Sequence, residues 1–370
     1  MKSLNLIMPC YNEEQSLEHL IIEKIIPLRN KCKEEYNLSL TLTIIDDASL
    51  DNSLKIAERL SKKFKWINVL RHSKNQGKGA ALRTGLACAK GDFIGIQDAD
   101  EEYNPEDYIK LLRPILQNKA DVVYGSRYLR PDSRRILSFW HTLMNKFLTI
   151  CSNMFTGLDI SDMETCYKLF TNKVAKELAP KLKENRFGFE PEITSYIAQG
   201  RYRLYECAIE YTPRTYEEGK KITYKDGIRA LYCIFHYGAP YAPLPMQFLL
   251  YTFIGGLSAV ANLVLFTVFI FSKVTLPYST ILSFCLAAGL NYWLCTVLLF
   301  KHKAFWSGKT ELLMYLVTLC IMGVFDYSLT LGLIKIGTGC LTAKLTASIV
   351  CLIGNFVFRK YLVFPLPKTK

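Results

Sequence analysis

Histidine is scarce in this chain, and two common signatures of nucleotide-binding proteins are missing. Only five histidines occur among 370 residues, so a mechanism built on a histidine base has few candidates. No G-x-G-x-x-G follows the first apolar run, and no G-x-x-x-x-G-K-[ST] is present. These absences argue against a nicotinamide-dependent dehydrogenase and against a Walker A protein.

Neither a C-x-x-C pair of cysteines nor the pattern of a cleavable signal peptide is visible in the sequence. The 12 cysteines are scattered without a C-x-x-C pair, which indicates free thiols in a reducing compartment rather than disulfides or a zinc site. The apolar stretch at residues 1–9 is too short for a cleavable signal peptide, so we expect the amino-terminal domain in the cytosol. A net charge of +13 favours an anionic partner. No basic module interleaved with aromatic residues is present, so we expect no nucleic acid.

The chain is divided by composition into two halves. Hydrophobic residues make up 50% of it, but long charge-free runs begin only after about Tyr237. We therefore expect a cytosolic domain at residues 1–237, with amphipathic helices near the membrane, and a transmembrane domain at residues 238–370.

The first half alternates short apolar runs with helical patterns. This alternation predicts an α/β domain with a mostly parallel sheet and helices on both faces. The predicted strands are at residues 4–8, 40–45, 67–70, 93–96 and 122–124, and one predicted helix covers residues 105–117.

Two aspartates follow the strand at residues 93–96. Asp98 and Asp100 would lie at the carboxyl end of that strand, where open α/β sheets bind ligands. Such oxygen ligands suit a hard divalent cation that also holds substrate phosphates. The alternative is a solvated acidic loop. Gly77-Lys78-Gly79 starts a helix and would bind phosphate through backbone amides, although this signal is weak on its own.

Arginines follow the strand at residues 122–124. Arg127 closes that segment, and Arg134 and Arg135 precede an apolar helix. Periodicity leaves two interpretations equally open. The helix lies in the headgroup region of a membrane beside phosphate-binding arginines, or it is a core helix with a solvated basic end.

The second half contains four candidate membrane spans, at residues 248–271, 278–300, 312–334 and 341–358. Lysines after the second span, together with Arg359 and Lys360 after the fourth, indicate cytosolic loops. Four spans would place both termini inside. Asp326 in the third span is either functional or, as we favour, hydrogen-bonded to a neighbouring span.

Several of these segments together resemble a known family, the family 2 glycosyltransferases of the GT-A fold. Within that family the likeness is to dolichyl-phosphate mannose synthases and bacterial polyprenyl-phosphate glycosyltransferases with a fused four-helix membrane domain. The segments that carry the resemblance are Pro9-x-Tyr11-Asn12-Glu13, Asp46-Asp47-x-Ser49-x-Asp51, Gly77-Lys78-Gly79-Ala80, Asp98-Ala99-Asp100, Gly125-Ser126-Arg127-Tyr128, Arg186-Phe187-Gly188-Phe189-Glu190 and the basic segment from Arg214 to Lys221.

The resemblance implies a role for each matching residue. On the donor side it assigns Pro9, Tyr11, Glu13 and Asp47 to the nucleotide base, Lys78 and Gly79 to donor binding, and Arg214 and Lys220 to the diphosphate. Asp98 and Asp100, with Glu102 nearby, would bind Mg²⁺ or Mn²⁺. Arg127 and one of Arg134 and Arg135 would bind the acceptor phosphate, and Asp162 would belong to the segment beneath the sugar. Relatives often carry Gln where this chain has Glu102.

The implied reaction is an inverting transfer from a UDP- or GDP-linked sugar to a polyprenyl phosphate such as undecaprenyl or dolichyl phosphate. The acceptor phosphate is already an anion, so no strong base is needed, which fits the few histidines. We expect an integral protein of a prokaryotic plasma membrane. Two alternatives stay open. One is a processive polysaccharide or glycolipid synthase, although no Gln-x-x-Arg-Trp motif occurs; the other is a flippase with a sugar-nucleotide-binding module. Close packing at Gly255-Gly256 leaves a homo-oligomer open as well.

Overall fold

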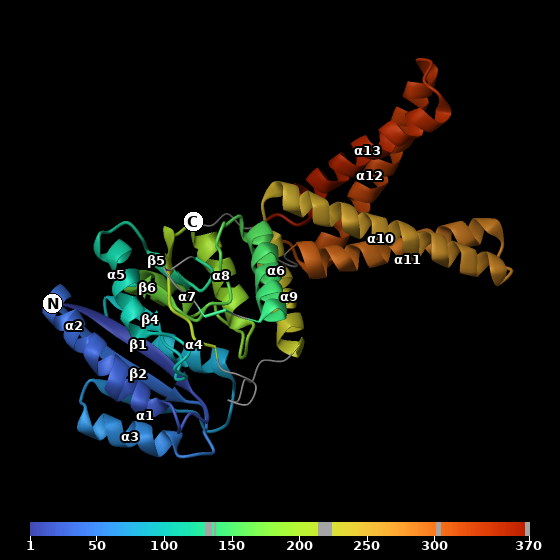
Figure 1. The fold of residues 1–370 in the computed structure, drawn as a ribbon. Coiled ribbons are helices and arrows are strands. Elements are labelled where there is room, and N and C mark those ends of the chain that lie inside the picture. The colour runs from blue at the N-terminus through green and yellow to red at the C-terminus, as the bar shows by residue number, and fades with distance from the viewer. Residues whose placement is uncertain (130–134, 137, 214–223, 301–304, 367–370) are drawn as a thin grey trace. The chain divides into compact units, whose positions relative to one another are not determined.

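A computed structural model describes residues 1–129, 135, 136, 138–213, 224–300 and 305–366. These residues form two compact units, Met1–Gly238 and Ala239–Lys370. Figure 1 shows the sheet and its helices in the first unit and long helices in the second.

The first unit is built on a seven-stranded sheet with the order β3-β2-β1-β4-β6-β5-β7. Its strands are β1 (Lys2–Cys10), β2 (Leu38–Asp46), β3 (Ile67–Arg71), β4 (Phe93–Ile96), β5 (Val122–Ser126), β6 (Lys168–Thr171) and β7 (Leu204–Ala208). β1 pairs in parallel with β2 and β4, β2 with β3, and β5 with β7. Only β6 is antiparallel to its neighbours β4 and β5. The predicted α/β fold with a mostly parallel sheet is confirmed.

Helices connect the strands. They are α1 (Leu17–His19), the π-helical segment η1 (Leu20–Ile25), α2 (Ile26–Tyr36), α3 (Ser53–Lys63), α4 (Lys78–Cys88), the 3₁₀ turn η2 (Pro105–Asp107), α5 (Tyr108–Leu116), α6 (Phe139–Thr156), α7 (Asn172–Leu178), α8 (Phe189–Gly200) and α9 (Tyr224–Gly238).

Consecutive residues of the central strand β1 contact helices on opposite faces of the sheet. Ile7 lies against Gly85 of α4, where an added Cβ would meet the Ile7 side chain at 2.2 Å. Leu6 instead lies beside Gly95 of the neighbouring strand β4, where Tyr108 of α5 also packs. Both faces of β1 are therefore buried, which explains why Leu4, Leu6, Ile7 and Met8 are all apolar. The buried Asn5 between them donates to the side chains of Thr41 and Thr43 on β2.

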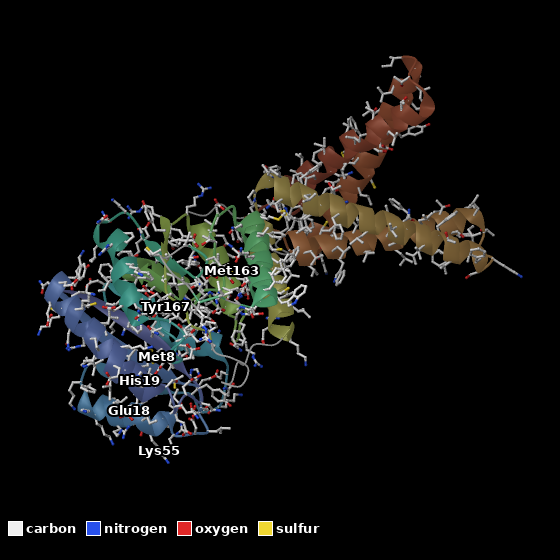
Figure 2. All side chains as sticks on the ribbon, viewed as in Figure 1. Met8, Glu18, His19, Lys55, Met163 and Tyr167 are labelled. Atoms are coloured by element: carbon white, nitrogen blue, oxygen red, sulfur yellow. The ribbon has the colours of Figure 1, made fainter. Side chains whose placement is uncertain are left out.

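The second unit consists mainly of long apolar helices. The short turn η3 (Ala239–Tyr241) comes first. The long helices are α10 (Leu244–Phe271), α11 (Leu276–Leu294) with its π-helical extension η4 (Cys295–Leu299), α12 (Gly308–Lys335), and α13 (Cys340–Phe358) with its π-helical extension η5 (Arg359–Val363). α10 packs along α11, and α12 along α13. Most of the side-chain atoms on these helices are carbon, drawn white in Figure 2. Among the described residues, four helices are long and apolar enough to cross a membrane, which confirms the predicted four-helix region.

The sequence predicts Arg359 in a cytosolic loop after the fourth span. The structure shows that this prediction is wrong. Arg359 continues the fourth helix and is 5% exposed. Its guanidinium donates to the side chain of Asn291 and lies 4.4 Å from the ring centre of Tyr315. Asn291 in turn donates to Ser258 of α10. Arg359 therefore ties η5 to α10, α11 and α12, and the orientation argument rests on the lysines alone.

Candidate functional site

A cavity of about 720 Å³ lies in the first unit, beside the carboxyl ends of the central strands. Pro9 is the penultimate residue of β1, Asp47 follows β2, and Asp98 lies two residues after β4, so three parallel strands bring these residues to one edge of the sheet. Of the residues predicted for the site, the cavity is lined by Pro9, Tyr11, Glu13, Asp47, Lys78, Asp98, Asp100, Glu102 and Arg127.

Asp98 already has a cationic neighbour. The Lys78 Nζ lies 2.9 Å from one carboxylate oxygen of Asp98 and 3.0 Å from the other. Burial disfavours the ammonium, but the charge of Asp98 outweighs that effect and raises the pKa of Lys78. Lys78 is the first residue of α4, so this helix start supplies a side-chain cation to the site.

Asp100 and Glu102 lie on the turn after Asp98. The Glu102 N–H donates to Asp100 Oδ1 at 3.4 Å, and Tyr211 donates its hydroxyl to Glu102 Oε2 at 2.8 Å. Ser16 donates to the Ala99 carbonyl at 3.0 Å. The turn that carries the aspartates is thus attached both to the segment after β1 and to the segment after β7.

These carboxylates fit a hard divalent cation. Asp98 holds an ammonium at contact distance, so the position favours positive charge. Among the described residues no group of three or more His, Cys, Asp or Glu side chains is arranged to hold a metal. The fit is therefore to an ion such as Mg²⁺ or Mn²⁺ that takes one or two carboxylates and completes its shell with phosphate oxygens and water.

Asp47 is buried and organises the loop before α4. Its carboxylate accepts hydrogen bonds from the N–H groups of Gln76 and Gly77, at 3.0 and 2.7 Å to their nearer oxygens, and pairs with His72 Nδ1 at 2.6 Å. His72 is 8% exposed and also contacts Thr84 at 2.9 Å. His72 therefore positions Asp47 and is not among the cavity-lining residues.

Gly77 and Gly79 permit close packing with the segment before α8. An added Cβ on Gly79 would lie 2.6 Å from the Glu184 carbonyl oxygen and 2.8 Å from that of Arg186. Gly77 has a φ of +98°. The Ala80 N–H donates to the Asn185 carbonyl at 3.0 Å, so one amide of this helix start is used within the protein. Gly79 itself does not line the cavity, and its assignment to the donor stays a prediction.

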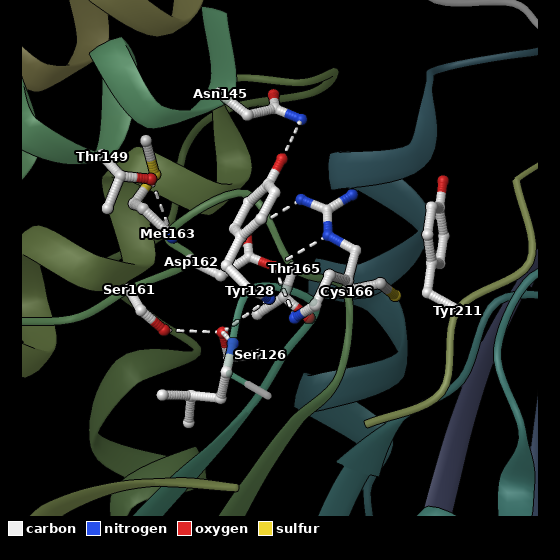
Figure 3. A network of polar contacts seen from close by, with 12 residues as sticks. Ser126, Tyr128, Asn145, Thr149, Ser161, Asp162, Met163, Thr165, Cys166 and Tyr211 are labelled. Atoms are coloured by element: carbon white, nitrogen blue, oxygen red, sulfur yellow. Dashed lines mark hydrogen bonds and ion pairs between the residues drawn. The ribbon is translucent and has the colours of Figure 1, made fainter. Parts of the chain in front are cut away.

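Arg127 is held by a buried carboxylate, Asp162 (Figure 3). The Arg127 Nε and Nη2 donate to the two oxygens of Asp162 at 2.7 and 2.8 Å, and its backbone N–H donates to the same group at 3.0 Å. Burial opposes the charged guanidinium, but Asp162 prevails and raises the pKa of Arg127. The Tyr211 ring lies 5.1 Å from the guanidinium.

Of the other predicted basic residues, Arg135 is described; it is exposed and does not line the cavity. Arg134, Arg214 and Lys220 lie outside the described residues, and their assignments stay predictions. Tyr211, three residues before Arg214, is at the site and forms a bridge with Tyr103.

Helix α6 has one face in the cavity and an apolar face in solvent. His141, Met144, Asn145, Phe147 and Leu148 line the cavity. On the other face, Phe139, Trp140 and Ile150 are 68, 72 and 59% exposed, and Ile136, which precedes the helix, is 80% exposed. A core helix with a solvated basic end does not expose such a surface, so this observation favours the membrane-surface interpretation.

Two cavity residues, Glu164 and Glu190, were not identified as site residues from the sequence. Glu190 was noted only as part of the segment from Arg186, and Glu164 only as part of the segment around Asp162. Both line the cavity beside Cys166.

The sequence was then compared with known proteins. The profile of glycosyl transferase family 2 matches residues 5–178, and the profile described as GtrA/DPMS, transmembrane domain, matches residues 250–364. The dolichyl-phosphate beta-glucosyltransferase of Drosophila melanogaster is 30% identical over 229 residues, which cover 60% of this chain and 69% of that protein. The chain belongs to glycosyl transferase family 2.

Further known proteins are similar to parts of the chain. The dolichyl-phosphate beta-glucosyltransferase of Dictyostelium discoideum is 30% identical, with 56% of this chain and 66% of that protein aligned. This family 2 chain thus matches about two thirds of the length of the two glucosyltransferases. The UDP-N-acetylglucosamine–dolichyl-phosphate N-acetylglucosaminyltransferase of Methanococcus voltae is 24% identical, with 60% and 91% aligned. A solved structure of glucosyl-3-phosphoglycerate synthase from Mycobacterium tuberculosis with UDP gives a TM-score of 0.49 at 14% identity, covering 64% of this chain and 80% of that one.

Proposed function

We propose that this protein transfers a sugar from a nucleotide diphosphate-sugar to a polyprenyl phosphate, with inversion at the anomeric carbon. The observation that carries the proposal is the combined lining of the cavity. Asp98, Asp100 and Arg127 all line it, and so does one face of α6, whose outer face is apolar. A polar donor and a lipid-borne phosphate would meet in this cavity. The names of the relatives, which act on dolichyl phosphate, support this acceptor.

The reaction is a single displacement. An oxygen of the polyprenyl phosphate forms a bond to the anomeric carbon, and the bond from that carbon to the diphosphate oxygen breaks. The nucleoside diphosphate leaves with the electron pair. No proton has to be removed from the acceptor, because a phosphate monoester is an anion at neutral pH. The cavity agrees with a reaction that needs no base, because His141 is the one histidine among the described residues that line it.

The protein stabilises negative charge at two positions. A divalent cation bound by Asp98 and Asp100 would supply Lewis-acid stabilisation of the leaving diphosphate. Lys78 adds a positive charge beside Asp98, and Arg127 adds one near the acceptor position. Asp162 fixes the orientation of Arg127, and a preorganised cation of this kind stabilises transition-state charge without reorganisation.

The proposed setting is the cytosolic side of a membrane. Four apolar helices would cross the bilayer, which leaves both termini and the first unit on the cytosolic side, and the exposed face of α6 would lie in the headgroup region. Undecaprenyl or dolichyl phosphate, Mg²⁺ or Mn²⁺, and UDP- or GDP-linked donors are the proposed ligands.

Transfer by the purified full chain tests the proposal. The protein in nanodiscs that contain undecaprenyl phosphate or dolichyl phosphate is given radiolabelled UDP- and GDP-sugars with Mg²⁺ or Mn²⁺, with and without EDTA. We expect one donor to give an organic-extractable product that mild acid cleaves and EDTA abolishes. A polymer, or nucleotide release without a lipid product for every donor, would contradict the proposal.

A further inference from the structure

Two carboxyl groups in the cavity each have an oxygen without a hydrogen-bond partner. Glu164 precedes β6, and Glu190 lies in the first turn of α8. Both line the cavity, and Glu190 is only 4% exposed. Among the described residues, nothing donates a hydrogen bond to Glu164 Oε1 or to Glu190 Oε2. A buried polar atom left this way costs about 1–3 kcal/mol, so a ligand group is expected to supply the missing bonds.

The neighbouring lysines do not satisfy these two oxygens. The Lys78 Nζ lies 2.9 Å from Asp98 but 3.9 Å from Glu190, and the nearer oxygen there is Oε1 rather than Oε2. Lys168 is fully buried; its ammonium donates to the backbone carbonyls of Met163 and Thr165 and lies 4.6 Å from the Tyr124 ring. The two orphaned oxygens therefore remain available for the ligand.

One of the two groups holds a proton at neutral pH. Burial, and next the charge of Glu190, raise the pKa of Glu164 to about 8, against the opposing effects of Lys168 and Arg127. A protonated Glu164 donates and accepts hydrogen bonds, and the unpaired oxygen of Glu190 accepts one. A sugar hydroxyl also donates and accepts. A phosphate or a uronic acid carboxylate only accepts, so it would leave the Glu190 oxygen without a donor.

Resting on the proposed function, we propose that Glu164 and Glu190 hold hydroxyl groups of the donor's sugar, and that the protein therefore uses an uncharged sugar and rejects uronic acids. The geometry places this sugar seat beside Lys78 and Asp98, where the diphosphate would end.

Replacements at Glu164 test the inference. Glu164→Leu removes the hydrogen bonds but keeps a side chain of similar size, and Glu164→Gln keeps one donor and one acceptor. Transfer to polyprenyl phosphate is measured with the best uncharged donor, with its deoxy analogues and with UDP-glucuronic acid. The affinity for UDP alone is measured by calorimetry. Glu192→Gln is the control, because Glu192 is buried in α8, the helix that carries Glu190, does not line the cavity, and accepts hydrogen bonds from the N–H groups of Lys183 and Glu184.

We expect Glu164→Leu to lower kcat/KM for the uncharged donor by about 10- to 100-fold and to abolish discrimination against one deoxy analogue. Glu164→Gln should stay within about threefold of the unchanged protein, and both should bind UDP with unchanged affinity. Glu192→Gln should lower thermal stability without altering the ratio between donors.

Three results would overturn the inference: unchanged donor discrimination in Glu164→Leu, equal loss of UDP affinity in that variant, or efficient use of UDP-glucuronic acid by the unchanged protein. If no donor yields a lipid product, the proposed function fails. Comparison of the affinities for UDP-glucose and UDP between the unchanged protein and Glu164→Leu then still tests the sugar seat.

Discussion

Replacing Asp162 with Asn leaves the buried guanidinium of Arg127 without its counter-ion. Asp162 is fully buried and accepts three hydrogen bonds from Arg127, two of them from the guanidinium at 2.7 and 2.8 Å. Removal of one partner of a buried ion pair costs about 3–5 kcal/mol, because the remaining charge is left uncompensated. At about 2–4 °C for each kcal/mol in a domain of this size, the first unit should unfold roughly 6–20 °C lower.

Thermal unfolding of the full chain in detergent measures this effect. The control is Asp121→Asn, because Asp121 makes a similar bidentate pair with Arg203 at an exposed position, where ion pairs contribute about 0–1 kcal/mol. The double variant Arg127→Met with Asp162→Leu should recover most of the stability but not the transfer activity. A shift for Asp162→Asn no larger than that of the control would refute the reasoning.

Three further predictions concern packing, protonation and the membrane surface. Gly79→Ala should destabilise the first unit by about 1–3 kcal/mol in denaturant unfolding, because its Cβ would lie 2.6 Å from the Glu184 carbonyl; Gly227→Ala, with nothing within 4 Å, is the matched control. The raised pKa of Glu164 means that the folded state binds its proton more tightly than the unfolded chain does. Stability from this group is present below its ordinary value of 4.5 and is lost as the pH rises through about 8; Glu164→Gln should flatten unfolding profiles over that range, and an identical slope would contradict the assignment. Trp140→Ser with Phe139→Ser should raise the KM for polyprenyl phosphate in bilayers about tenfold or more while leaving the KM for the donor unchanged; equal changes in both would argue against contact of α6 with lipid.

The sequence predicted β1 to β5, and the central strands were clearest because they are buried on both faces. Such strands are continuous apolar runs, and the strand at residues 93–96 was placed within its observed limits. The sequence missed the parallel edge strand β7, whose side chains are only partly buried. The antiparallel β6 was missed because it has only four residues and begins with Lys168, whose side chain is buried against backbone carbonyls and an aromatic ring. A lysine in this position looks like a surface residue in the sequence.

Pairing of side chains across the site was not predictable from the sequence. The motif Asp98-Ala99-Asp100 was recognisable by itself, but its cationic neighbour Lys78 is 20 residues away. The partner of Arg127 is 35 residues away. Glu164 and Glu190 come together only because the segment before β6 and the start of α8 meet in the cavity. Distances of this kind are determined by the tertiary fold, which local patterns do not encode.

The measurement that tests the central claim most directly is transfer of labelled sugar into polyprenyl phosphate by three matched proteins: the unchanged chain, Asp100→Ala, and Asp159→Ala. Asp159 is an exposed aspartate outside the cavity lining. If Asp100 helps to stabilise the leaving diphosphate, its replacement should lower the rate of transfer by about 10²-fold or more, and Asp159→Ala should transfer at the rate of the unchanged chain. Equal rates for all three proteins would contradict the account.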